Sequence, residues 1–142
     1  MRTYVIVFIT ALALVLAVAF AVVHQSVRPK ADRLLEMACI AGVNAIMADD
    51  KKITAVKDRS YSEPDDGYRS VALRAETPDG ERKYECLFAE HFTLAGYEAG
   101  FHNLSIDGQT YLAKAGTEGT GSSEEWDKFY QASYAVIYPS KK

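Results

Sequence analysis

Two cysteines, Cys39 and Cys86, are the residues whose type and position point most directly to chemistry. Cys39 falls on the apolar stripe of an expected helix, and Cys86 falls on the inward face of an expected strand. Residues that meet across a helix–sheet interface can reach the Cα separation of about 4.4–6.8 Å that a disulfide requires. We therefore predict a Cys39–Cys86 disulfide, with two buried free thiols as the alternative. A redox-active pair is not expected, because the chain contains no Cys-x-x-Cys motif.

Histidines and acidic residues gather in one stretch of the sequence, which raises the question of a metal site. The stretch contains Glu90, His91, Glu98, His102 and Asp107. Protein zinc sites use short fixed spacings, such as ligands at i and i+4 on a helix, and this stretch has none of them. No recognisable motif places a catalytic partner beside His91 either. We expect surface or core histidines, and we predict neither a metal site nor a catalytic site.

A glycine-rich segment runs from Gly116 to Ser123, directly before the last expected helix. Glycines are typical of phosphate-binding loops, but such a loop also needs a Gly-Lys-Ser/Thr sequence, and the lysine is absent here. Ser122 and Glu125 instead have the spacing of a helix capping box. We expect a flexible loop followed by a helix cap, and we predict no cofactor.

Three tyrosines, Tyr130, Tyr134 and Tyr138, share one side of the last expected helix, at i, i+4 and i+8. If Trp126 and Phe129 face the core, the tyrosines are partly exposed and available to a partner protein or to the lipid interface. The alternative is that the tyrosine stripe is itself the core face. We take the three tyrosines as candidate partner-contact residues.

The element that positions all of these residues at a membrane is an uncharged apolar run from Tyr4 to Val23. A helix of about 20 such residues spans the hydrocarbon core of a bilayer. A cleaved signal peptide is the alternative, with candidate sites at residues 17–19 and 19–21, but both sites lie inside the apolar run. We predict an uncleaved transmembrane anchor within residues 1–27, in contact with the lipid bilayer through residues 4–23.

Two kinds of signal disagree about the orientation of this anchor in the membrane. Arg28, Lys30 and Arg33 outnumber Arg2 and the amino terminus, which favours a cytoplasmic C-terminal domain by the positive-inside rule. The very short N-terminal tail and the predicted disulfide favour export. We predict that the domain lies on the exported side, periplasmic or extracellular.

Residues 28–142 are long enough for one small soluble domain. The chain has 16 Lys and Arg against 19 Asp and Glu, a formal net charge of −3. A nucleic-acid-binding module would present a basic face, so we predict no nucleic-acid partner.

The domain is expected to be α+β. Arg28-Pro29 should interrupt the first helix or begin a new one, and apolar residues at helical spacing predict a helix over 31–48. The period then changes to two, which predicts an antiparallel sheet of four to five strands. Val71, Leu73 and Ala75 should share its buried face, with Arg69, Ser70 or Arg74 exposed.

Turn and cap residues complete the expected fold. Pro78 and Gly80 predict a hairpin between strands over 68–76 and 82–90, and further strands, with a turn at Asp107-Gly108, are expected over 93–113. A C-terminal helix should follow Ser122 and end before Pro139. The helices are expected to pack on one face of the sheet.

These features predict a non-enzymatic, single-pass accessory or assembly subunit of a larger membrane complex, whose partners are other membrane protein subunits. The order of apolar helix, amphipathic helix and antiparallel sheet also resembles pilins and pseudopilins, which implies a filament subunit. The Gly-Phe processing site and the early glutamate of that family are absent. A third alternative is an exported ligand-binding or enzymatic domain with its site among His91, His102 and the tyrosines.

Overall fold

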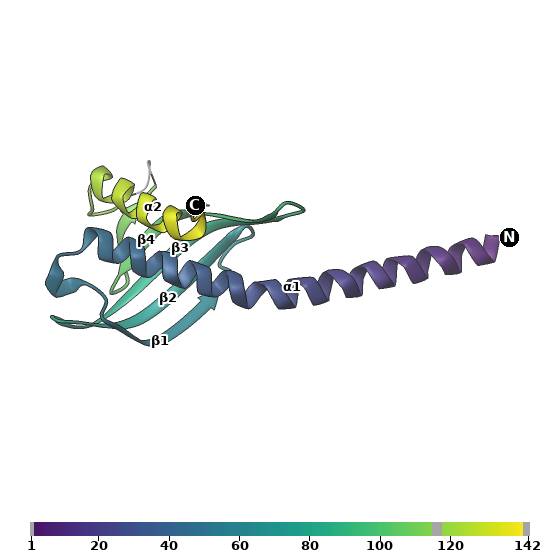
Figure 1. The fold of residues 1–142 in the computed structure, drawn as a ribbon, viewed down its shortest axis with the longest axis horizontal. Helices are drawn as coiled ribbons and strands as arrows, with labels where there is room; N and C mark the ends of the chain where they lie inside the picture. Colours follow the sequence, from purple (N-terminus) through teal and green to yellow (C-terminus); the bar gives the residue numbers. More distant parts are fainter. Residues whose placement is uncertain (1, 115–117, 141–142) are drawn as a thin grey trace. The chain divides into compact units, whose positions relative to one another are not determined.

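The computed structural model describes residues 2–114 and 118–140, with side chains from residue 4 onward (Figure 1). The chain falls into two compact units, Met1–Ala31 and Asp32–Lys142. Helix α1, Arg2–Ile46, supplies the first unit and continues into the second. The second unit also contains a short 3₁₀ helix, Asp49–Lys51, a five-stranded sheet and helix α2, Ser123–Ile137.

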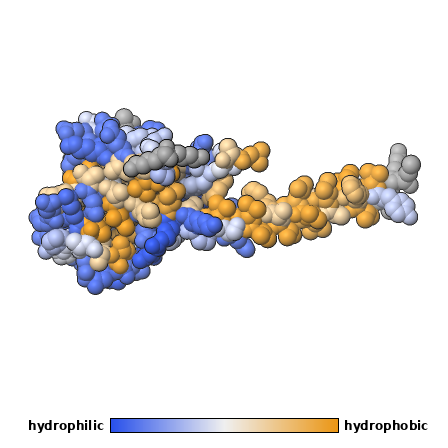
Figure 2. Space-filling view, in the orientation of Figure 1, coloured by the Kyte–Doolittle hydropathy of each residue, from blue (hydrophilic) through white to orange (hydrophobic). Residues whose placement is uncertain are grey.

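The first unit is a helix whose described side chains are exposed from Tyr4 to Ser26, and its apolar part appears orange in Figure 2. From Tyr4 onward the helix is long and apolar enough to cross a membrane. The hydroxyl groups of Thr10 and Ser26 donate to carbonyls of the helix backbone. Thr10 Oγ1 donates to the Ile6 carbonyl at 3.0 Å. In an apolar medium such internal hydrogen bonds replace those that water would make, so this unit fits a membrane anchor.

The prediction that Pro29 interrupts the helix is wrong. Pro29 lies inside α1, which is one helix from Arg2 to Ile46. A proline removes one backbone hydrogen bond and crowds the carbonyl four residues earlier, at Gln25, but its fixed φ is compatible with a helix. Packing holds the chain helical beyond the proline, because Leu35, Cys39 and Val43 are fully buried.

The sheet is an antiparallel meander in the order β1-β2-β3-β4-β5. Its strands are Ala55–Ser62, Tyr68–Thr77, Gly80–Thr93, Gly96–Ile106 and Gln109–Ala113. The β4–β5 turn is the predicted Asp107-Gly108, where both residues have positive φ, 50° and 83°. This is the backbone that tight two-residue hairpins need and that Asp-Gly adopts readily. The Pro78–Gly80 hairpin is also present, so the expected antiparallel sheet is confirmed.

One face of the sheet forms the core together with both helices of the domain. Val71 pairs with Cys86, and Leu73 pairs with Tyr84, so that the buried residues of β2 and β3 lie side by side. The last part of α1 and the whole of α2 lie over this face (Figure 1). From α2 the core receives Phe129, Ser133 and Ile137. The α+β layout with helices on one face is therefore confirmed.

Helix α2 begins with the predicted capping box. Ser122 Oγ accepts a hydrogen bond from the Glu125 amide at 3.2 Å, and Glu125 Oε2 accepts one from the Ser122 amide at 2.8 Å. The helix ends at Ile137, two residues before Pro139. Part of the expected glycine-rich loop, residues 116–117, lies outside the described residues, as do Lys141 and Lys142.

Candidate functional site

Four aromatic side chains form a continuous row along α2, which we call the aromatic row: Trp126, Tyr130, Tyr134 and Tyr138. Neighbouring rings have centroid separations of 5.2, 5.9 and 4.6 Å along the row. Residues four apart lie almost above one another on a helix, so the sequence spacing itself produces this contact. The row therefore presents one connected aromatic surface on one side of α2.

The aromatic row flanks the core and is not the core face. The fully buried side of α2 carries Phe129 and Ser133, whereas 47 % of Tyr134 is exposed and Tyr130 and Tyr138 are half-buried. The tyrosine stripe is therefore partly exposed, which is the first of the two interpretations of the sequence. Whether a partner binds there stays a prediction.

The two ends of the aromatic row hydrogen-bond backbone groups at the free edge of β4. Strand β5 pairs with β4 only from Asn103 to Ile106, which leaves the earlier part of β4 without a strand neighbour on that side. The Tyr138 hydroxyl accepts a hydrogen bond from the Ala99 amide at 3.0 Å and donates one to the Ala99 carbonyl at 3.2 Å. Trp126 Nε1 donates to the His102 carbonyl at 3.4 Å. The row therefore covers an edge that could otherwise pair with another strand.

The two central hydroxyls are not engaged in this way. Within the described part of the chain, no protein group hydrogen-bonds the hydroxyl of Tyr130 or of Tyr134. Tyr134 thus combines an exposed ring, in contact with a neighbouring ring on each side, with a hydroxyl that is available to a partner. Tyrosine in such a setting offers apolar area and a hydrogen bond at a low cost in side-chain entropy.

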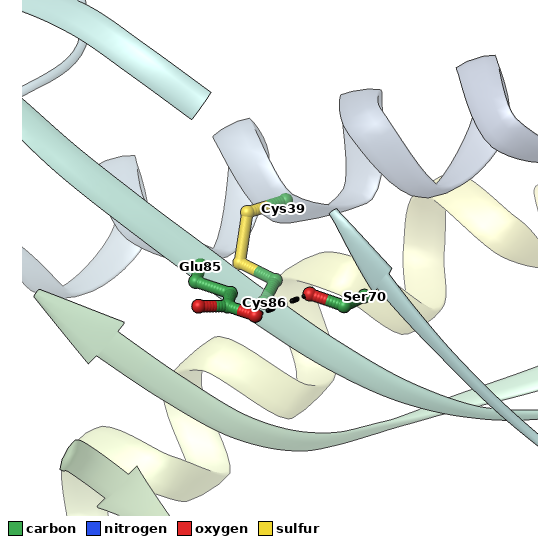
Figure 3. Close-up of a disulfide and its surroundings, with 4 residues drawn as sticks. All are labelled: Cys39, Ser70, Glu85 and Cys86. Carbon is green, nitrogen blue, oxygen red and sulfur yellow. Dashed lines mark hydrogen bonds between the residues drawn. A yellow bond between two sulfur atoms is a disulfide. The ribbon is translucent and has the colours of Figure 1, made fainter. Parts of the chain in front are cut away.

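The predicted disulfide joins Cys39 of α1 to Cys86 of β3, with a Cα–Cα distance of 5.9 Å. Figure 3 shows the bond crossing from the helix to the strand, next to the hydrogen bond from Ser70 Oγ to Glu85. Both cysteines are fully buried. The bond fixes the last part of α1 to the middle of the sheet.

An ionic cluster near the start of the domain part of α1 was missed by the sequence analysis. Asp32 is bound by two nitrogens of Arg69, at 2.8 and 2.7 Å. Glu36 pairs with Arg59 at 3.1 Å and accepts a hydrogen bond from the Tyr61 hydroxyl at 2.7 Å. Burial and this hydrogen bond raise the pKa of Tyr61 to about 12.

The expectation that Arg69 or Ser70 is exposed is wrong, whereas Arg74 is exposed. Arg69 has the same parity as Val71, so it points to the helix face, where Asp32 neutralises it. Ser70 is buried on the opposite face and donates to Glu85 at 2.6 Å. The two-residue period of the strand was the available signal for the position of Arg69.

The histidines and acidic residues of the 90–107 stretch do not converge. His91 stands opposite Glu98 in the β3–β4 ladder, while Glu90 is buried and accepts a hydrogen bond from Tyr97 at 2.6 Å. His102 packs edgewise on Tyr68 at 5.1 Å, and burial lowers its pKa. Among residues 2–114 and 118–140, no three His, Cys, Asp or Glu side chains are grouped as a metal site would require.

The sheet face opposite the helices carries a shallow depression of about 620 Å³. Most of the residues that line it are polar or charged, among them Ser60, Arg74, Lys83, Glu85 and Ser105. Arg74 lies 3.6 Å from Glu81, and Glu85 is bound by Ser70. Because charges of both signs are present and several are paired, we assign no ligand class to this surface.

Comparison of the chain with protein-family models, with curated proteins and with solved structures finds no match. The chemistry of the aromatic row, the disulfide and the apolar helix is therefore the basis for a functional proposal.

Proposed function

We propose that this protein is a single-pass, membrane-anchored accessory or assembly subunit, whose exported domain binds another membrane protein subunit through the aromatic row. The observation that carries the proposal is Tyr134, an exposed ring that contacts an aromatic neighbour on each side, on a small domain that is joined to an apolar helix. Cys39 and Cys86, the Asp32 and Glu36 carboxylates and His102 are all engaged in structural contacts, which favours a binding role over catalysis.

The apolar helix supports a role beside other membrane proteins. Its surface includes small residues at Ala11, Ala13, Ala17, Ala19 and Ala21. Small side chains allow a neighbouring membrane helix to approach closely, so that dispersion contacts and backbone proximity can hold two helices together. The helix would then supply a second contact with the same partner.

The disulfide supports an exported domain. Disulfides persist in oxidising compartments and are kept reduced in most cytosols. The buried Cys39–Cys86 bond ties helix to sheet in a domain with a small core, a setting in which a cross-link contributes a large share of the stability. This outweighs, in our proposal, the basic residues that follow the apolar run.

The test is isolation of the full-length protein from its own membranes in mild detergent. We expect a partner to copurify in fixed stoichiometry and to be lost from the Tyr134→Ala variant. Gln131→Ala is the matched control, because Gln131 is also exposed on α2 but lies outside the aromatic row. Isolation of the wild-type protein as a lone monomer would contradict the subunit role, and equal loss from both variants would contradict the site.

A filament subunit is the second candidate, favoured by the continuity of α1. A single helix that is apolar in its first part and packs on an antiparallel sheet in its last part resembles the architecture of pilins. Assembly of that kind requires N-terminal processing, so an intact Met1 in the mass spectrum of the mature protein would argue against it.

A further inference from the structure

The β3–β4 hairpin ends in an apolar tip, which we define as residues 91–96. All of these residues are exposed, with Leu94 fully exposed and Phe92 41 % exposed. Beyond the first unit, the described large apolar side chains that are exposed are Met37, Phe92, Leu94 and Tyr134. Two of the four therefore lie at this one tip, which Figure 2 shows as an orange end to the projecting hairpin.

The turn at this tip has an unusual composition for its exposure. The sheet's other turns contain the polar or flexible residues that water-exposed hairpins favour, such as Pro78-Asp79 and Asp107-Gly108. Here the turn residues are Leu94 and Ala95, flanked by Phe92. Apolar side chains placed at the most accessible point of a domain indicate a contact surface.

The tip stands clear of the rest of the sheet (Figure 1). Strand β2 pairs with β3 only as far as Ala89, opposite Tyr68, and the Glu90 amide donates to the Gly67 carbonyl at 2.8 Å. The acidic β1–β2 turn over 63–67 therefore lies at the level of Glu90. At about 3.3 Å per residue, Leu94 lies about 13 Å beyond that level.

The hairpin projects from the end of the domain at which α1 enters. Asp32, the first residue of the second unit, is bound by Arg69, and Arg69 stands opposite Phe88 in the ladder. Near its end, α1 contacts the chain next to the far end of β2, because Asn44 hydrogen-bonds Ile53, which lies there. Strand β2 therefore runs in the same direction as this part of α1. Strand β3 is antiparallel to β2, so from Phe88 to Leu94 it runs outward at the Asp32 end.

The length of the connecting chain limits how far this end can be from a membrane. Residues 24–31 separate the apolar run from Asp32, and they are helical. At 1.5 Å per residue they span about 12 Å. The reach of the hairpin beyond Glu90 is therefore comparable with the greatest distance between the start of the domain and the end of the apolar run.

We propose that the tip of the β3–β4 hairpin inserts Phe92 and Leu94 into the interfacial region of the lipid bilayer that residues 4–23 cross. The proposal rests on the membrane anchoring proposed above. Tyr97 supports it, because its ring lies 5.0 Å from that of Phe92 and its hydroxyl binds Glu90. Tyrosine with an apolar body and a hydrogen-bonded tip is enriched at membrane interfaces. The contact would orient the domain and the aromatic row relative to the bilayer.

The test uses the full-length protein reconstituted into vesicles of phosphatidylcholine and phosphatidylglycerol. The native cysteines are joined to each other, so a cysteine introduced as Leu94→Cys is the thiol that a polarity-sensitive fluorophore labels. We expect blue-shifted emission from position 94 and its quenching by lipids that carry a spin label near the headgroup. The matched control is Asp65→Cys, an exposed position in the β1–β2 turn at the same end of the domain, which should stay water-like and unquenched.

A third label, at Leu12→Cys, separates the two proposals. It is read with lipids that carry a spin label deep in the acyl chain, because residue 12 lies near the middle of the run 4–23. Quenching at position 12 together with water-like emission at position 94 would overturn the hairpin insertion and leave the anchor intact. Absence of lipid quenching at position 12 would overturn the anchor itself. Equal quenching at positions 94 and 65 would also overturn the proposal, since it would indicate that this whole end of the domain, and not the tip, contacts lipid.

Discussion

Gly42 of α1 lies against the ring of Phe129 of α2, so closely that a Cβ at position 42 would overlap that ring. In an unconstrained helix Gly→Ala stabilises by about 1 kcal/mol. Here we expect Gly42→Ala to lower the free energy of unfolding by about 1–3 kcal/mol, because the helices must separate or Phe129 must leave its rotamer. Chemical unfolding followed by the fluorescence of Trp126, the only tryptophan in the sequence, measures it.

The matched control is Gly100→Ala. No atom lies within 4 Å of a Cβ added at Gly100, and its φ is not in the positive range. We expect a change within about 0.5 kcal/mol. Equal destabilisation by the two substitutions would contradict the close approach of α1 and α2.

The Cys39–Cys86 bond predicts a redox-dependent stability. Its ends are separated by 47 residues in sequence, and closing a loop of that length stabilises a fold by about 3–4 kcal/mol in the chain-entropy model. We expect the double variant Cys39→Ala, Cys86→Ala to lose about this amount. A reductant should lower the wild-type unfolding free energy to a similar value and leave the double variant unchanged. A wild-type protein indifferent to reductant, with both thiols free, would contradict the bond.

The Asp32–Arg69 pair predicts a large single-residue effect. The side chains are only 10 % and 13 % exposed, so Asp32→Ala leaves a nearly buried guanidinium without its counter-charge. We expect a loss of about 3–5 kcal/mol. The double variant Asp32→Leu, Arg69→Met should recover part of this loss, because it removes both charges.

The control for this pair is the exposed ion pair of Glu124 with Lys128 on α2. Lys128→Ala should change the unfolding free energy by less than about 1 kcal/mol, as exposed pairs do. Comparable losses from Asp32→Ala and Lys128→Ala would show that burial does not distinguish the two pairs.

Local chemistry explains which parts of the fold the sequence predicted. Asp107-Gly108 and Ser122-x-x-Glu125 each depend on a few adjacent residues, and both form as expected. The alternation of Val71 and Leu73 fixed the buried face of β2, and the same period placed Cys86 beneath the helix that carries Cys39. These signals lie within one element or one turn.

Features that depend on distant residues could not be predicted in the same way. Asp32 is paired with Arg69, which lies far along the chain, so no local pattern pointed to the pair. Leu94 was expected in a strand and is a turn residue. The turn was not predicted because an apolar side chain at a hairpin tip departs from the usual turn composition. The helix through Pro29 depends on tertiary packing, which overrides local propensity.

Glu125 predicts a pH dependence for the start of α2. The hydrogen bond from the Ser122 amide is the main cause that lowers the pKa of Glu125. A carboxylate whose pKa is lower in the folded state stabilises that state above its unfolded pKa of about 4.3 and loses the effect as pH falls through the folded value. We expect Glu125→Gln to weaken the acid-induced loss of stability. An identical acid profile for variant and wild type would contradict the role of Glu125 in the cap.

Tyr138 gives a prediction that separates structure from binding within the aromatic row. Tyr138→Phe keeps the ring stack but removes the hydroxyl that serves both backbone groups of Ala99 at the free edge of β4. We expect a loss of about 1–3 kcal/mol in unfolding free energy and faster hydrogen exchange of the Ala99 amide, because a buried donor is left unpaired. Tyr134→Phe should leave both quantities unchanged, since its hydroxyl has no protein partner in the described part of the chain. Copurification of the partner then separates the two roles. If Tyr134→Phe weakens it and Tyr138→Phe does not, the Tyr134 hydroxyl serves recognition and the Tyr138 hydroxyl serves the fold. The reverse result would place the partner contact at the β4 edge.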